Sequence, residues 1–384
     1  MPATETPKTI SSAQEIQDEL AVKRGRLQAL LAERNADAIL IARHENIAWL
    51  TAGQAEIRIG LLRETGAASL LVTRDDRVFY LTTNNEAPRL AEEEFAGLGY
   101  TPIVQPWYGA DQGAAIRSVV GDGTVLTDAP NGATANGTMP VVSLYPLRAE
   151  LTAGEIARYR WLGRTVADTT SELLMTLAPG MTERGIQARL MERLVAQGIL
   201  PSLLLDAVDG RIRRFRHAVP RAGTLERFGM LNFCARRWGL TISITRFVHF
   251  GAMPAELEEK FGVVAEVSAR LLAATRAGAT GDELFHVARA AYAALGHAGE
   301  ETMHHQGGAT GYLEREWVAK PGGTERVESA QAFAWNPSLQ GAKVEDTVLL
   351  RDGAIEVLTG TPELPVMVTP FAGVEYRSAG VLRK

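Results

Sequence analysis

The chain has 384 residues, a length that indicates two domains or at most three. Hydrophobic residues make up 46% of it and charged residues 22%, and the mean hydropathy of -0.04 is typical of a globular protein. The net charge of -5 argues against general nucleic-acid binding, because such proteins need a basic surface to neutralise phosphates. The single cysteine, Cys234, excludes a disulfide framework and a cysteine-based zinc cluster.

No apolar run approaches the roughly 18 residues of a membrane-spanning helix, so we expect no membrane partner. The first residues lack the basic and apolar regions of a signal peptide. Together these features predict a soluble, cytoplasmic protein.

Residues 1–149 alternate between helix and strand patterns, which predicts a small α/β domain. Apolar residues recurring at a period of about 3.6 predict an amphipathic helix that ends near Asn35. The apolar run 38–42 predicts a buried strand, and the runs 68–73 and 78–82 flank a charged turn and predict a hairpin. The remaining predicted elements are a helix at 87–95, a strand at 102–104, a helix at 113–120 and a strand at 124–127.

The second part begins with a long predicted helix, 153–177, which the segment 178–182 with its Pro-Gly pair ends. A second helix is predicted from Thr182 to about Gln197. Further helices are predicted at 255–275 and 282–295, and strands at 202–207, 230–236, 240–250, 332–335, 347–350 and 354–358. Long helices with strands between them predict an α+β domain that contains one curved antiparallel sheet.

Four segments beyond residue 150 form an ordered set of motifs. They are Leu151-Thr152-Ala153-Gly154-Glu155-Ile156, Ala178-Pro179-Gly180-Met181-Thr182-Glu183, Ile242-Ser243-Ile244-Thr245-Arg246-Phe247 and Val344-Glu345-Asp346-Thr347-Val348-Leu349. In this order they resemble the pita-bread family of Xaa-Pro aminopeptidases, prolidases, methionine aminopeptidases and creatinase. The first part resembles the family's creatinase-type N-terminal domain. The resemblance implies an α+β pita-bread domain at residues 150–384, preceded by a smaller α/β domain at residues 1–149.

The resemblance also shows where this chain departs from the family. The peptidases hold two divalent metals with two aspartates, a histidine and two glutamates, and the motif register places these ligands at Asn232, Ser243, Gly308, Asn336 and Glu345. Only Glu345 keeps a ligand side chain, and the replacements supply no charge to offset two divalent ions. We therefore predict that the chain is not a metal-dependent peptidase and needs no metal or other cofactor.

Two adjacent histidines, His304 and His305, lie near the lost ligand position. Neighbouring residues on a strand point to opposite faces, so we do not expect them to form a replacement metal cluster.

Creatinase implies a different chemistry, because it has this fold without metal and cleaves a C–N bond of a small molecule. His217 occupies the family's H-x-x-P position, where the creatinase histidine transfers a proton, and imidazole titrates at about pH 6.5. Arg315 and Glu316 resemble the R-E pair of creatinase, and a guanidinium there would bind a substrate carboxylate. Glu345 matches a carboxylate that creatinase keeps, but Thr245 replaces a creatinase glutamate, which disfavours creatine itself.

The resulting prediction is a metal-independent, creatinase-like hydrolase of an amide, amidine or cyclic C–N bond. In it His217 is the general acid and base, Glu345 orients the substrate, and His304 donates a hydrogen bond to the developing oxyanion. The predicted substrate-binding residues are Arg315, Glu316, Asn232, Ser243 and Asn336.

Arg58 and Arg63 lie in a loop whose creatinase counterpart carries an arginine into the partner's active site. This implies a homodimer with a shared site, in which either arginine contacts the substrate of the partner.

Each predicted site residue could instead have a purely structural role. His217 and His304 could serve only as hydrogen-bonding residues, Glu345 could pair internally with Arg315, and Arg315 with Glu316 could form a surface salt bridge of little energetic value. Two other functions therefore remain open. One is a catalytically inactive family member that binds a peptide, ligand or protein partner. The other is a biosynthetic enzyme that uses acid–base chemistry without hydrolysis.

Overall fold

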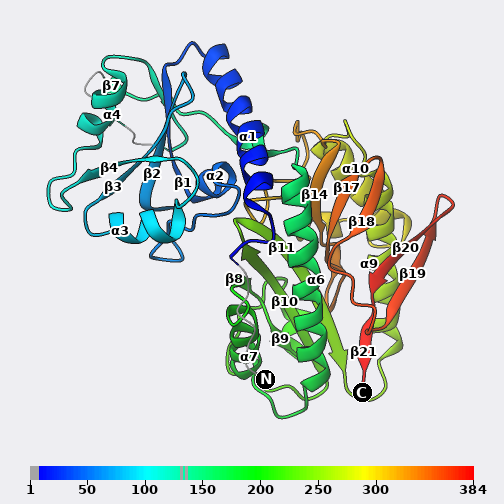
Figure 1. Cartoon of the computed structure of the whole chain (residues 1–384). Helices are drawn as coiled ribbons and strands as arrows, with labels where there is room; N and C mark the ends of the chain where they lie inside the picture. The colour runs from blue at the N-terminus through cyan, green and yellow to red at the C-terminus, as the bar shows by residue number, and fades with distance from the viewer. Residues whose placement is uncertain (1–7, 130–132, 135–136) are drawn as a thin grey trace. The chain divides into compact units, whose positions relative to one another are not determined.

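The structure, a computed structural model, describes residues 8–129, 133–134 and 137–384. The chain divides into two compact units, Pro7–Glu155 and Ile156–Lys384, which are considered separately (Figure 1). Among the described residues, no helix is both long and apolar enough to cross a membrane.

The first unit is a five-stranded sheet with helices, in the strand order β4-β3-β2-β1-β5. Its strands are β1 (Ala38–Arg43), β2 (Thr65–Thr73), β3 (Val78–Thr83), β4 (Thr101–Gln105) and β5 (Val125–Thr127), with a small β6–β7 pair (Ala133–Thr134 and Gly137–Thr138). Its helices are α1 (Ala13–Glu33), α2 (His44–Leu50), α3 (Ala87–Arg89), the π-helical turn η1 (Leu90–Glu94), α4 (Gln112–Val120) and α5 (Tyr145–Arg148). The α/β layer structure predicted for this part is confirmed.

Local sequence explains these boundaries well. Ser12 caps α1 in a capping box, in which its hydroxyl accepts the Glu15 N–H and the Glu15 carboxylate accepts the Ser12 N–H at 2.7 Å. The predicted hairpin is present, with Val72 paired to Val78. The helix α2 was not predicted, because its last residues are buried on every side and show no amphipathic period.

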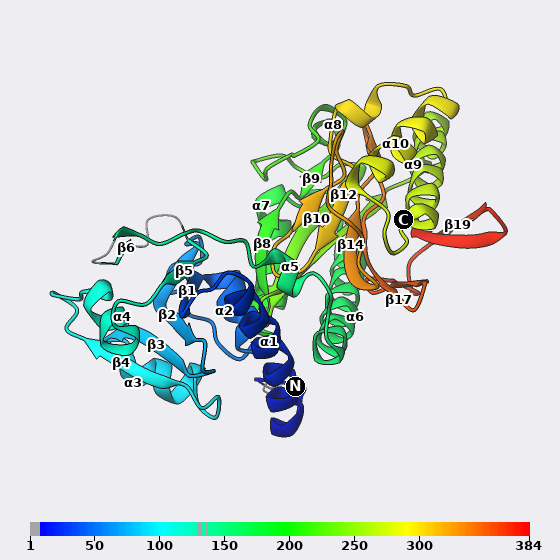
Figure 2. The same ribbon diagram turned by 90° about the horizontal axis from the view of Figure 1, so that it is seen from above.

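The second unit contains two five-stranded sheets, ordered β21-β11-β10-β8, with β9 beside β10, and β13-β12-β14-β17-β18. The strands are β8 (Leu200–Leu204), β9 (Ala207–Val208), β10 (Phe228–Arg237), β11 (Leu240–His249), β12 (Gly307–Thr310), β13 (Trp317–Val318), β14 (Ala330–Trp335), β15 (Ser338–Leu339), β16 (Ala342–Lys343), β17 (Asp346–Arg351), β18 (Ala354–Val357), β19 (Val366–Phe371), β20 (Val374–Ala379) and β21 (Val381–Arg383). The helices are α6 (Ala153–Thr176), α7 (Glu183–Val195), α8 (Gly210–Arg214), α9 (Ala255–Ala274), α10 (Gly281–Ala294) and the short η2 (Glu300–Thr302). Helix α9 packs against α10 and the β19–β20 hairpin, which projects from the sheets (Figures 1 and 2).

The prediction of one antiparallel sheet is wrong in two respects. The two sheets meet at β11 and β17, where the ladder is interrupted because the Ser243 N–H donates to the Thr347 hydroxyl at 2.8 Å instead of to a strand carbonyl. The Thr245 N–H still reaches the Glu345 carbonyl at 3.1 Å, so the sheets remain joined there. In addition, β21 runs parallel to β11. This junction between the sheets positions the candidate site.

Candidate functional site

The side chains at the family's ligand positions are buried around the junction of the two sheets. Asn232 on β10 pairs with Thr245 on β11, and Ser243 lies two residues before Thr245. Alternate residues of a strand share one face, so these three side chains lie on the same face of the sheet. Glu345 directly precedes β17, and its side chain is 3% exposed.

The Glu345 carboxylate is the centre of a closed polar network. Its Oε2 accepts hydrogen bonds from the Asn232 amide and the Thr245 hydroxyl, both at 2.7 Å. The Lys343 ammonium lies 2.9 Å from the same oxygen. Its Oε1 accepts from Arg315 Nη2 at 3.0 Å, and Arg315 Nη1 donates to the Ser243 hydroxyl at 3.0 Å. Two cations therefore flank one buried carboxylate.

Lys343 was not singled out in the sequence. A signal was present, since residues two apart in an extended segment share a face and Lys343 lies two residues before Glu345. Burial raises the pKa of the Glu345 carboxyl, but Lys343 and Arg315 outweigh this effect and hold that pKa at about 2. Glu345 is therefore a permanent anion, neutralised from within the chain.

The residues at these ligand positions do not fit the family's pair of divalent metals. The only carboxylate among them is already bound to two side-chain cations, which would repel metal ions. At Gly308, a Cβ would lie 2.0 Å from the Trp317 carbonyl oxygen, so no histidine fits the position of the family's ligand. Asn336 is 3% exposed, and its Oδ1 has no hydrogen-bond partner within the described part of the chain, yet a single neutral oxygen does not offset two divalent charges.

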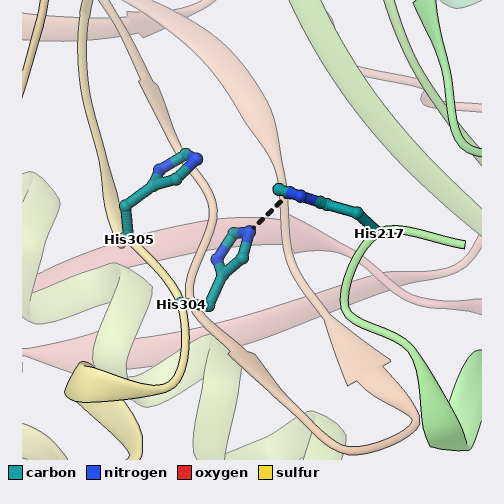
Figure 3. Close-up of side chains that lie close together, drawn as sticks. All are labelled: His217, His304 and His305. Carbon is teal, nitrogen blue, oxygen red and sulfur yellow. Dashed lines mark hydrogen bonds between the residues drawn. The ribbon is translucent and has the colours of Figure 1, made fainter.

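Beside this network, three histidines converge from two loops (Figure 3). His217 follows α8, and His304 and His305 lie between η2 and β12. The Nε2 atoms of His217 and His304 are 2.9 Å apart, in hydrogen-bond contact. The ring of His305 stacks on that of His304, with centroids 4.4 Å apart and an angle of 23° between the planes.

The expectation that His304 and His305 point to opposite faces is wrong. The strand β12 begins only at Gly307, so the two histidines lie in a loop to which strand alternation does not apply. Their rings and that of His217 can each present a nitrogen atom within 4.8 Å of the others. The cluster was missed because its geometry depends on this loop and not on a periodic pattern.

All three imidazoles favour the neutral form. Burial lowers the pKa of His217, and it lowers the pKa of His304 to about 2 and that of His305 to about 4, because a charged ring is poorly solvated there. The nearby Lys343 ammonium adds to the effect in each case, while Glu345 opposes it. The histidines and the Glu345 network therefore form one electrostatically connected site.

Interactions from neighbouring residues hold the two histidine loops together. Arg216, next to His217, forms an ion pair with Glu300 at the start of η2 and donates to the Ser338 hydroxyl at 3.0 Å. The buried Gln306 side chain donates to the His304 carbonyl, and its Oε1 accepts from the Tyr292 hydroxyl at 2.9 Å. The rings are thus held by contacts that lie outside the cluster itself.

The remaining residues predicted to bind substrate are Glu316, Arg58 and Arg63. The Glu316 carboxylate accepts the Tyr312 N–H at 2.9 Å, which fixes the turn after β12. Arg58 is 7% exposed and binds Glu56 through two hydrogen bonds of 2.9 and 2.8 Å, so its guanidinium is held inside its own unit. Arg63, by contrast, is exposed.

Comparisons with known proteins agree with the predicted fold. Residues 157–352 match the model of Metallopeptidase family M24, and residues 23–115 match that of the Creatinase/Prolidase N-terminal domain. No curated protein compared with the chain matches it. Both the pita-bread fold class and the creatinase-type N-terminal domain are confirmed.

Solved structures of the same fold are distant in sequence. Dipeptidase PepE from Mycobacterium ulcerans superposes with a TM-score of 0.73 at 18% identity, covering 90% of this chain and 97% of that one. The Xaa-Pro dipeptidase from Bacillus anthracis has a TM-score of 0.72 at 19% identity, covering 91% and 98%. The N-terminal domain of FACT complex subunit SPT16 from Cicer arietinum (chickpea) has a TM-score of 0.65 at 14% identity, covering 89% and 97%. The match over residues 157–352 establishes that the chain belongs to metallopeptidase family M24, a family of hydrolases related to the prolidases.

Proposed function

We propose that the chain is a hydrolase that acts without its family's two-metal centre and cleaves the C–N bond of a small amide, amidine or cyclic compound. The observation that carries the proposal is the contact between the His217 and His304 rings at 2.9 Å, beside a carboxylate already neutralised by Lys343 and Arg315. Acid–base groups are therefore retained where metal ligands are lost.

A neutral His217 can act first as the general base and then as the general acid of the reaction. When its Nε2–H donates to His304 Nε2, its Nδ1 lone pair accepts a proton from water as the water oxygen bonds to the electrophilic carbon. The C–N bond then breaks, and His217 returns the proton to the leaving nitrogen. In this proposal His304 orients the His217 ring through this contact, a role different from the oxyanion role expected from the sequence.

Arg315 can bind a substrate carboxylate, as predicted, only if its present contacts rearrange. Its Nη2 is bound to Glu345 and its Nη1 to Ser243 and to the Glu314 carbonyl, so a substrate carboxylate would have to compete with these partners. Asn232 and Ser243 belong to the same network, and Asn336 offers an unpaired acceptor among the described residues.

The proposal predicts that His217→Ala lowers turnover by about 100-fold or more, the usual contribution of a general acid–base group. Chelator-treated protein would be screened against small amides, amidines and cyclic ureas, with release of amine or ammonia as the measured product. His286→Ala is the matched control, because His286 lies on α10 with a side chain 43% exposed. Unchanged turnover in His217→Ala would exclude this base.

A second candidate function is ligand or partner binding without catalysis. The observation that favours it is the direct Arg315–Glu345 ion pair, which occupies the two charged groups expected to bind substrate. A protein of this fold described as a FACT complex subunit is a precedent for a role within an assembly. Absence of hydrolysis of every compound in the screen would favour this alternative.

We also propose a homodimer, with the loop around Arg63 at its interface. Ile59, Leu61 and Leu62 of this loop are 68%, 57% and 99% exposed, so an apolar surface accompanies the exposed arginine.

A further inference from the structure

We propose that His217, His304 and His305 form a binding site for one divalent transition-metal ion, such as Zn²⁺, distinct from the family's two-metal centre. The three residues belong to two loops of the same unit, and Figure 3 shows their rings facing a common space. None of them occupies a position to which the family's motifs assign a metal ligand.

The distance between the His217 and His304 rings is close to that of a zinc site. Two imidazole nitrogens bound to tetrahedral zinc at about 2.0–2.1 Å lie roughly 3.3 Å from each other. His217 Nε2 and His304 Nε2 are 2.9 Å apart, and one nitrogen from each of the three rings lies within 4.8 Å of the others. A small rotation of the exposed His305 side chain would complete a three-histidine site.

One donor atom already lacks a partner. His304 is 9% exposed, and its Nδ1 has no hydrogen-bond partner among the residues that the structure describes. A buried polar atom without a partner destabilises a fold unless another group satisfies it. An ion bound through His304 Nδ1 would satisfy this atom, whereas an ion bound through Nε2 would leave it without a partner.

Contacts from neighbouring residues hold the two loops that carry the histidines in place. The Arg216–Glu300 ion pair connects the residue before His217 to the segment that leads into His304. Gln306 fixes the His304 carbonyl. Such supporting contacts orient ligand rings before the ion binds, and their loss typically weakens metal binding by about 10- to 100-fold.

The ligand type determines which ion the site takes. Three neutral imidazoles suit Zn²⁺, Co²⁺ or Ni²⁺, whereas Mg²⁺ and Ca²⁺ require oxygen ligands. The Glu345 carboxylate is bound to Lys343 and Arg315, so it offers no free oxygen ligand to a hard ion. The site is therefore expected to bind one ion through nitrogen and to leave a coordination position open to solvent.

The inference does not depend on the proposed hydrolysis. It does predict a connection, because an ion bound to His217 Nε2 leaves the ring proton on Nδ1, so that Nδ1 can no longer accept a proton from water. If both proposals are correct, one equivalent of metal inhibits the metal-free enzyme.

The test is a titration of the full chain, freed of metal with a chelator, with Co²⁺ alone, followed by its visible absorption and by displacement with Zn²⁺. We expect one equivalent to bind. His304→Ala and His305→Ala should each weaken binding by about tenfold or more, and Arg216→Ala by about tenfold, since it removes a supporting contact but no ligand. His286→Ala should bind like the wild type, and circular dichroism without metal would show that each variant is folded.

Absence of Co²⁺ binding, or one equivalent that His305→Ala leaves unchanged, would overturn the three-histidine site. The results also distinguish failure of the metal site from failure of the proposed hydrolysis. If the ion binds as expected but increases hydrolysis, the metal-independent mechanism is wrong and the site stands. If hydrolysis requires His217 and no ion binds, the site is wrong and the mechanism stands.

Discussion

Glu345→Gln is expected to destabilise the protein by about 3–5 kcal/mol, the usual cost of removing one partner from a buried ion pair. The side chain of Glu345 is 3% exposed and lies 3.0 Å from Arg315 and 2.9 Å from Lys343. A neutral amide leaves both cations in a poorly solvated interior without a counter-ion. The free energy of unfolding in urea, measured in the presence of a chelator, gives this difference.

The same substitution at the protein surface is the matched control. Glu356 pairs with Arg160 at 2.7 Å, but its side chain is 44% exposed, so Glu356→Gln should cost only about 0–1 kcal/mol. The double variant Glu345→Gln/Lys343→Met should be more stable than Glu345→Gln alone, because it removes one of the unpaired charges. Equal effects of Glu345→Gln and Glu356→Gln would mean that Glu345 does not neutralise buried cations.

Gly308→Ala is expected to cost about 3 kcal/mol or more, as overpacking does where the backbone must move. The added Cβ would lie 2.0 Å from the Trp317 carbonyl and 2.8 Å from the Val318 Cα, both on the paired strand β13. Neither atom can move without separating the two strands. Thermal and urea unfolding of the purified variant, or its failure to accumulate as folded protein, gives the result.

Gly262→Ala provides the comparison for this prediction. Gly262 lies within α9, and a Cβ added there would meet no neighbouring atom within 4 Å, so alanine should stabilise the helix by about 0.5–1 kcal/mol. Wild-type stability of Gly308→Ala would show that β12 has room for a side chain. In that case a histidine ligand could be restored by one substitution, and the loss of the metal centre would be less complete than the structure indicates.

Much of the fold was predictable because its signals are local. The long helices α6, α9 and α10 carry apolar residues at helical spacing, and Thr182 and Thr280 cap their helices through side-chain hydroxyls. The division into two sheets was not predictable, since it depends on a hydroxyl of Thr347 that replaces one strand-to-strand bond. That contact joins residues 104 positions apart in the chain.

The candidate site, too, could be predicted only in part from the sequence. The exchanged ligand positions at Asn232, Ser243, Gly308 and Asn336 were evident from the motifs. The ion pair of Lys343 with Glu345 was not evident, because a lysine carries no motif and its role depends on burial. The meeting of His217 with His304 and His305 was also not predictable, as it depends on loop geometry and on the Arg216–Glu300 ion pair between distant segments.

The central claim is that the family's two-metal centre has been replaced by a cation network in this chain. The most direct test is the metal content of His217→Ala/His304→Ala/His305→Ala after incubation with excess Mn²⁺ or Co²⁺ and removal of free ions. These substitutions leave Asn232, Ser243, Asn336 and Glu345 in place, so a working two-metal centre would survive them. We predict one equivalent of Co²⁺ in the wild type and none in the triple variant. Two equivalents bound by the triple variant would contradict the account.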